Sequence, residues 1–215
     1  IALRVSIMLI IGGSLAFFFL YPVYPDDVGT GGRIVQSVFH SVIARTAGFN
    51  SVDMTKFSEP LILLFTFLMF IGASPGSTGG GVKTTTFAVI LRSTLTATRG
   101  NKNINFMRHT LRPILSQRAT SVVVYYLGWC LIGVTCLSIA EPQIPVMKLI
   151  FEEVSALSTV GLSTGITSGL GTFAKTILVL SMYIGRIGTL TIVLALIRKK
   201  TSVQYTYSHA NILIG

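Results

Sequence analysis

Charged residues are scarce in this sequence. Asp, Glu, Lys and Arg make up 11% of the 215 residues, whereas a soluble domain usually has about 25%. Cysteine is also rare, and the two cysteines present, Cys130 and Cys136, lie in one apolar stretch. Their spacing points them to different faces of a helix. The scarcity of charge argues against a soluble domain, and the cysteine spacing is typical of packing residues and supports neither a disulfide nor a metal site.

Long apolar stretches dominate the sequence instead. They cover about residues 5–20, 60–71 with a continuation at 82–91, 119–140, and 173–197. A bilayer core of ~30 Å requires about 20 helical residues. The third and fourth stretches have this length, the first is slightly short, and the second is long enough only if both halves count. The pattern predicts an all-α membrane protein with four spans, and the Tyr-Pro exit of the first stretch makes a poor signal-peptide cleavage site.

Basic and acidic residues are separated along the chain. The acidic residues all lie within 22–60 and 141–153, whereas basic residues gather at Arg4, within 92–118 and within 198–200. Because basic residues accumulate on the cytoplasmic side of membrane proteins, both ends and the 92–118 loop are expected in the cytoplasm. The net charge of +10 is therefore interpreted as a topological signal and not as a nucleic-acid interface.

Four acidic residues are expected outside the membrane, where they either attract cations or are ordinary solvated groups: Asp26, Asp27, Glu152 and Glu153.

The chain contains an internal repeat with a spacing of 113 residues. Thr46-Ala47-Gly48-Phe49 matches Thr159-Val160-Gly161-Leu162, and a one-residue gap just before the Thr changes the spacing to 112 upstream. Each unit consists of a span, a short amphipathic segment (33–45 or 146–158), a Thr-x-Gly sequence and a second span. The short segments cannot cross a bilayer. Because both end at a glycine, a re-entrant pore loop is favoured over an external loop.

The Thr-x-Gly sequences suggest an ion-binding backbone. A dehydrated potassium ion needs oxygens that replace its water shell, and potassium-channel filters supply carbonyls from a Thr-Val-Gly core. Glycine permits the backbone angles that such a filter requires. Glycine turns after surface helices are the alternative interpretation. The predicted filter residues are Thr46, Ala47, Gly48, Phe49, Thr159, Val160, Gly161 and Leu162.

Residues 73–81 interrupt the second apolar stretch. Proline removes a helix donor and glycine weakens a helix, so two half-helices joined by unwound backbone are expected. A simple kink is the alternative, but four glycines within 76–81 exceed what a kink needs. A phosphate-binding loop is excluded because Val82 separates Gly81 from Lys83. The predicted gate consists of Pro75, Gly76, Ser77, Thr78, Gly79, Gly80, Gly81 and Arg186.

Arg186 lies midway along the fourth apolar stretch. A charge at mid-bilayer costs ~2.5–3.5 kcal/mol on insertion scales, so this guanidinium should face water or a partner. It is either a cationic barrier in a pore or a structural residue bonded to carbonyls of broken helices. Lys83 has two similar possibilities, since it could extend to the interface or bond carbonyls freed by the loop.

These motifs together resemble the Ktr/Trk/HKT superfamily of potassium uptake proteins, most closely its bacterial KtrB-type membrane subunits. The resemblance rests on residues 39–50, on the glycine-rich 76–83 and on Gly185-Arg186-Ile187-Gly188. It implies four M1–P-loop–M2 units in one polypeptide. Residues 1–98 would be the third unit, 99–117 a cytoplasmic connection, 118–200 the fourth unit, and 201–215 a cytoplasmic tail, with two further units expected upstream.

The resemblance also implies a function and partners. It predicts gated potassium uptake across a bacterial plasma membrane, with the loop and Arg186 beneath the filter, a homodimer, surrounding lipid, and a cytosolic ring that binds the regulatory nucleotide. No organic cofactor, nucleic-acid partner or enzyme activity is expected of this chain, and sodium is a possible second ion. The alternatives are a secondary transporter with broken-helix repeats and a non-conducting membrane anchor.

Overall fold

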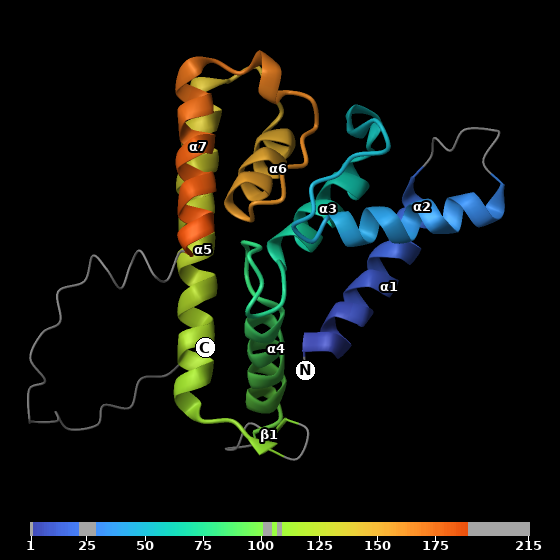
Figure 1. The fold of residues 1–215 in the computed structure, drawn as a ribbon. Coiled ribbons are helices and arrows are strands. Elements are labelled where there is room, and N and C mark those ends of the chain that lie inside the picture. The colour runs from blue at the N-terminus through green and yellow to red at the C-terminus, as the bar shows by residue number, and fades with distance from the viewer. Residues whose placement is uncertain (1, 22–28, 101–104, 107–108, 189–215) are drawn as a thin grey trace, which may run out of the picture.

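A computed structural model of the protein describes residues 2–21, 29–100, 105–106 and 109–188, and these residues are mostly helical (Figure 1). The helices are α1 (Ala2–Leu20), α2 (Thr30–Ile43), α3 (Glu59–Phe70), α4 (Thr84–Thr98), α5 (Pro113–Ala140), α6 (Val146–Leu157) and α7 (Thr172–Ile187). Short 3₁₀ turns cover Met54–Lys56 and Thr167–Gly169. Strands β1 (Asn105–Phe106) and β2 (His109–Thr110) pair antiparallel between α4 and α5. The prediction of a helical fold is confirmed.

Two helices of the described residues are long and apolar enough to cross a membrane. They are α1, with 19 residues, and α5, with 28, or about 28 Å and 42 Å of helix. The apolar helix α3 has 12 residues, and α7 has 16. The part of the fourth predicted stretch that follows Gly188 lies outside the described residues, as do the basic residues of 198–200 and the predicted tail.

The helix ends follow ordinary sequence signals. Pro113 is the first residue of α5 and Pro60 the second residue of α3, positions where a missing N–H costs nothing. Glu59 adds a negative charge to the first turn of α3, which favours the helix dipole. The C-terminal end of α7 is followed by Gly188, whose φ of 94° is not helical.

One helix contact is common to the two units, the packing of the short helix on the helix before it. α2 packs against α1 in the first unit, and α6 packs against α5 and α7 in the second. α6 also packs against α3, so the two units share an interface (Figure 1). The largest hydrophobic cluster spans that interface, since it joins Phe17, Ile43 and Phe65 of the first unit to Phe151 and Val160 of the second.

The short helices α2 and α6 occupy the positions of the two predicted amphipathic segments. They have 14 and 12 residues, or about 21 Å and 18 Å of helix, which is less than the ~30 Å of a bilayer core. The lengths therefore agree with segments that enter and leave on one side.

Of the two possibilities for the acidic residues of α6, the structure excludes ordinary solvated groups. Glu152 is 5% exposed and Glu153 is fully buried, so neither is a solvated surface group. α3, α5 and α7 surround α6, and both carboxyl groups accept hydrogen bonds within the protein. Asp26 and Asp27 lie outside the described residues.

Candidate functional site

Each short helix is followed by a turn with left-handed backbone. Thr46 has a φ of 70° and Thr159 a φ of 55°, and Gly48 and Gly161 have φ of 70° and 89°. Positive φ is uncommon for a residue other than glycine. Its presence at both Thr positions, with a left-handed glycine two residues later, shows that the repeat in sequence is also a repeat in backbone conformation.

The two turns touch each other. The carbonyl oxygen of Val160 lies so close to Gly48 that a Cβ there would collide with it, and the Cα of Gly161 is the next neighbour. Gly48 is thus required both by its φ and by the approach of the second turn. Of the other predicted filter residues, Phe49 points away from the protein interior, with 69% of its side chain exposed.

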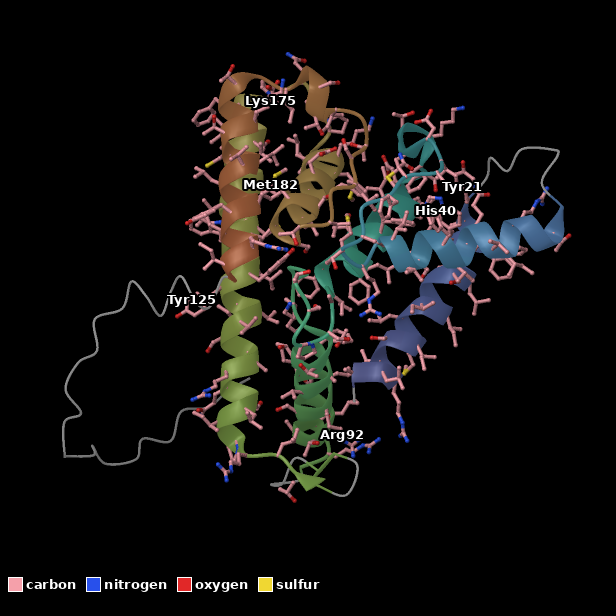
Figure 2. All side chains as sticks on the ribbon, viewed as in Figure 1. Tyr21, His40, Arg92, Tyr125, Lys175 and Met182 are labelled. Carbon is pink, nitrogen blue, oxygen red and sulfur yellow. The ribbon has the colours of Figure 1, made fainter. Side chains whose placement is uncertain are left out.

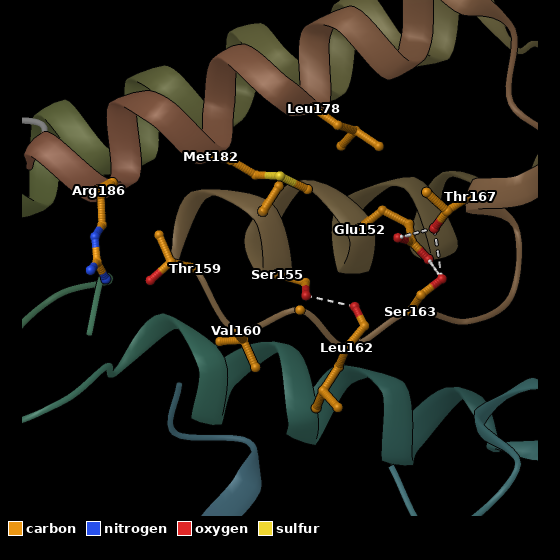
Figure 3. Close-up of a pocket in the computed structure, with 12 residues that line it drawn as sticks. Glu152, Ser155, Thr159, Val160, Leu162, Ser163, Thr167, Leu178, Met182 and Arg186 are labelled. Atoms are coloured by element: carbon orange, nitrogen blue, oxygen red, sulfur yellow. Dashed lines mark hydrogen bonds between the residues drawn. The ribbon is translucent and has the colours of Figure 1, made fainter. Parts of the chain in front are cut away.

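The turn after α6 is hydrogen-bonded to α6 itself. The Val160 N–H donates to the Ser155 carbonyl over 2.9 Å, and the Ser155 hydroxyl donates to the Leu162 carbonyl over 2.6 Å (Figure 3). Behind the turn, the hydroxyl groups of Tyr126 and Ser158 share a buried hydrogen bond of 2.6 Å. Residues 158–162 are therefore held to both α5 and α6.

A cavity of about 580 Å³ lies beside this turn. The predicted filter residues Thr159–Leu162 form part of its lining, and Leu178, Met182 and Arg186 of α7 line it as well. The side chains of Val160 and Leu162 point away from α7, toward α3 (Figure 3). No carbon or polar atom lies within 4 Å of the position that a Cβ on Gly161 would take. The turn therefore borders open space at Gly161.

The predicted gate segment is non-helical backbone between α3 and α4. It is closed at its base, because the Gly72 N–H donates to the Val82 carbonyl over 2.9 Å and the Val82 N–H donates to the Phe70 carbonyl over 3.0 Å. Gly76 and Gly81 within it have φ of 83° and 72°. Residues 71–83 thus leave the helix path and return to it at nearly the same place.

This loop lies against both turns. The Gly80 N–H donates to the Thr159 hydroxyl over 2.9 Å, and Gly79 is packed against the Thr46 hydroxyl so closely that a Cβ would collide with it. The two Thr side chains, one from each repeat, therefore contact adjacent glycines of the same loop. The structure brings the predicted gate and the predicted filter together.

Two cations bond carbonyl groups of the loop. Arg186 Nη1 donates to the Thr78 carbonyl, and Lys83 Nζ donates to the Gly79 carbonyl. Both residues line a second cavity of about 340 Å³ together with Ser77–Gly81. Of the two possibilities for Lys83, the structure shows the bond to a freed carbonyl.

Arg45 is a site residue that the sequence reasoning missed. Its guanidinium donates to the Gly72 carbonyl and to the Ser6 hydroxyl, each over 3.2 Å. It thereby ties α1 to the base of the loop, directly before Thr46. The sequence did contain a signal for this role of Arg45, because a charged residue within a short segment between two apolar stretches needs polar partners. Two further missed residues, His40 and Glu152, hold the segments that follow the turns and are described below.

Two units of helix, short helix, left-handed Thr-x-Gly turn and helix define a pore-loop membrane fold. The family described as "TrkH: Cation transport protein" matches residues 15–206, and the chain belongs to this family of membrane cation transport proteins. The family is one of transporters and not of enzymes, and the resemblance seen in the sequence is confirmed.

Two bacterial relatives show how far the similarity extends. The chain is 38% identical over 203 residues to Ktr system potassium uptake protein B of Vibrio alginolyticus, covering 92% of the chain and 44% of that protein. It is 40% identical over 170 residues to the protein of the same name from Bacillus subtilis, covering 79% of the chain and 38% of that protein. The chain thus spans less than half the length of these relatives.

A third relative and one solved structure add to this. The chain is 34% identical over 222 residues to the potassium/sodium uptake protein NtpJ of Enterococcus hirae, covering 100% of the chain and 49% of that protein. The crystal structure of the potassium transporter TrkH from Vibrio parahaemolyticus aligns with a TM-score of 0.71 at 22% identity, over 90% of this chain and 43% of that one. That alignment establishes the likeness in fold.

Proposed function

We propose that this chain forms half of a potassium-selective pore for potassium uptake, as the third and fourth pore-loop units of a Ktr-type membrane subunit. The observation that carries the proposal is the contact between the turns at Gly48 and Val160. Two matched turns with left-handed backbone meet, so their peptide groups border one region. Backbone carbonyls in such an arrangement replace the water shell of a potassium ion.

Selectivity is assigned to the backbone of Thr46–Phe49 and Thr159–Leu162. The names of the relatives from Vibrio, Bacillus and Enterococcus support potassium as the ion, and the Enterococcus name supports sodium as a second one. The two units described here leave the region beside Gly161 open. Two further units, contributed by the rest of the polypeptide, would close the ring of carbonyls.

Gating is assigned to the loop of residues 75–81 and to Arg186. The loop contacts both Thr side chains of the turns, and Arg186 bonds its Thr78 carbonyl. A cation held there raises the energy of a passing potassium ion. The bond and the charge act together, so that movement of the loop and of the guanidinium would open the path.

The surroundings of the pore follow from charge and from the relatives. The basic 92–118 region and both ends of the chain are assigned to the cytoplasm of a bacterial cell, because cytoplasmic segments are rich in Lys and Arg. The "Ktr system" names of the relatives support a second component. We assign this component, from the family resemblance, to a cytosolic nucleotide-binding ring. A homodimer surrounded by lipid completes the assembly.

The proposal is tested in proteoliposomes that contain the whole polypeptide to which this chain belongs. Wild-type protein should take up potassium down its gradient, with sodium flux smaller. Gly161→Asp places a charge in the open space beside the turn and should abolish this selectivity. Potassium uptake that needs a coupled second ion would favour a secondary transporter, and an unchanged ratio of potassium to sodium flux in Gly161→Asp would overturn the pore.

A further inference from the structure

His40 and Glu152 occupy the same position in the two repeats. They are 112 residues apart, which is the spacing of the repeat before the turns. Both side chains are buried, with 0% and 5% exposure. Neither contacts the gate loop, and neither is part of the predicted filter. Each nevertheless makes its polar contact with the segment that follows the turn of its own unit.

The carboxyl group of Glu152 uses both oxygens to hold the segment after Leu162. Oε1 accepts hydrogen bonds from the Ser163 hydroxyl over 2.6 Å, from the Thr164 N–H over 2.8 Å and from the Thr164 hydroxyl over 3.2 Å. Oε2 accepts a hydrogen bond from the Thr167 hydroxyl over 2.9 Å (Figure 3). With both oxygens engaged in this way, the carboxyl group holds the segment that follows the turn.

His40 makes the equivalent contact in the first unit. Its Nε2 shares a hydrogen bond of 2.9 Å with the hydroxyl of Ser51, and Ser51 and Thr164 are 113 residues apart, so the partners also match in the repeat. The imidazole ring is fixed by stacking on Phe17, with ring centroids 4.9 Å apart. Figure 2 shows His40 near Tyr21, where α1, α2 and α3 meet.

These contacts hold each filter segment at its far end. We call them the outer clasp, defined as the hydrogen bonds from Glu152 to Ser163, Thr164 and Thr167 and from His40 to Ser51. At the near end, Thr159 is bonded to Gly80 and Thr46 is packed against Gly79. Residues 47–50 of the first unit and 160–162 of the second lie between the two ends, and they include carbonyl groups that would face an ion.

From this arrangement we infer that His40 and Glu152 are positioning residues that fix the outer ends of the two filter segments and thereby set ion selectivity. The inference rests on the proposed function, because it assigns a role to residues behind the same filter. Discrimination between ions of different size requires the oxygens to stay at fixed positions, and a site that is loosely supported loses this ability. Glu152 makes four hydrogen bonds and His40 one, so the fourth unit should depend more strongly on its clasp.

The test measures the ratio of potassium to sodium flux, since a residue that only stabilises the fold would not change this ratio. The whole polypeptide is reconstituted in proteoliposomes as wild type, Glu152→Ala, Glu152→Gln, Thr167→Val and Ser51→Ala. Glu141→Ala is the matched control, because the Glu141 carboxyl also accepts a backbone hydrogen bond, from Gly171 over 2.6 Å, at a place that does not line the cavity beside the turn. Thermal unfolding in detergent is recorded for every variant.

Glu152→Ala should lower the flux ratio by at least about fivefold. Each hydrogen bond that is lost shifts the equilibrium between the held and the loosened filter segment by roughly two- to tenfold. Thr167→Val removes two hydrogen bonds of the Thr167 hydroxyl, with Glu152 and with Ser163, and Ser51→Ala removes the one with His40. Each variant should lower the ratio by at least about twofold to threefold. Glu152→Gln keeps an acceptor oxygen and should restore most of the ratio. Glu141→Ala should leave it unchanged.

A ratio in Glu152→Ala equal to that of wild type and Glu141→Ala overturns the inference while leaving the pore intact. If Glu152→Ala does not fold, Thr167→Val and Ser51→Ala provide the test instead. Potassium-to-sodium flux ratios equal to that of wild type in both variants would also overturn the inference. A wild-type protein without selective potassium flux contradicts the proposed function itself, which separates the two failures.

Discussion

The carbonyl oxygen of Val160 is packed against Gly48, and these two residues belong to different repeats. Gly48 has a φ of 70°, which adds backbone strain to the collision that any side chain would suffer. Gly48→Ala should therefore reduce potassium flux by at least about tenfold, because the left-handed region alone costs a non-glycine residue roughly 1–2 kcal/mol. Flux assays on the whole polypeptide check this. Gly12→Ala is the control, since nothing lies within 4 Å of its Cβ position.

Arg186 and the gate loop give a second prediction. Arg186→Ala removes the hydrogen bond to the Thr78 carbonyl and the positive charge, and deletion of residues 76–81 removes the loop. Both changes should raise potassium flux in liposomes. Lys175→Ala, in the same helix, removes a cation that bonds the Ser168 carbonyl over 3.1 Å and should leave flux as it is. Lower or unchanged flux in well-folded Arg186→Ala protein would count against the gate.

The packing of α7 on α6 gives a third prediction. Gly185 lies against the carbonyl of Leu157, where a Cβ has no room. Gly185→Ala should lower the free energy of unfolding by about 1–3 kcal/mol, as overpacking does. Gly128→Ala should raise it by about 0.5–1 kcal/mol, because Gly128 is in the middle of α5 with open space around it and alanine favours a helix. Thermal unfolding in detergent distinguishes the two, and equal effects would contradict this packing.

Cysteine labelling tests the orientation assigned to the chain in the membrane. Residue 99 lies at the end of α4, and residue 143 lies in the connection between α5 and α6; both are exposed. In cells carrying the whole polypeptide with Cys130 and Cys136 replaced by alanine, Gln143→Cys should react with an impermeant maleimide from outside. Arg99→Cys should react only after the membrane is opened. The reverse pattern would invert the assigned orientation.

The sequence predicted the parts of the site that depend on local patterns. The turns at Thr46 and Thr159 were located by the repeat, and their left-handed backbone is consistent with the glycines two residues later. The position of α6 was predicted because the repeat placed a short amphipathic segment at 146–158, directly before the second turn. These features need no knowledge of distant neighbours.

Features that depend on distant neighbours were missed or wrong. Glu152 and Glu153 were expected outside the membrane, either attracting cations or as solvated groups, whereas α3, α5 and α7 pack against their helix and the protein supplies hydrogen-bond donors. The partners of Arg45 lie on α1 and at Gly72, and spacing along the chain does not show such contacts. The repeat could have revealed the outer clasp, since His40 and Ser51 align with Glu152 and Thr164.

The most direct test locates the ion. Crystals of the whole polypeptide grown with rubidium or thallium should show anomalous density between the turns of Thr46–Gly48 and Thr159–Gly161, within coordinating distance of their carbonyl oxygens. Loss of that density in Gly48→Ala, with the fold intact, would agree with the account. Density bound only elsewhere, in protein that still carries selective potassium flux, would contradict it.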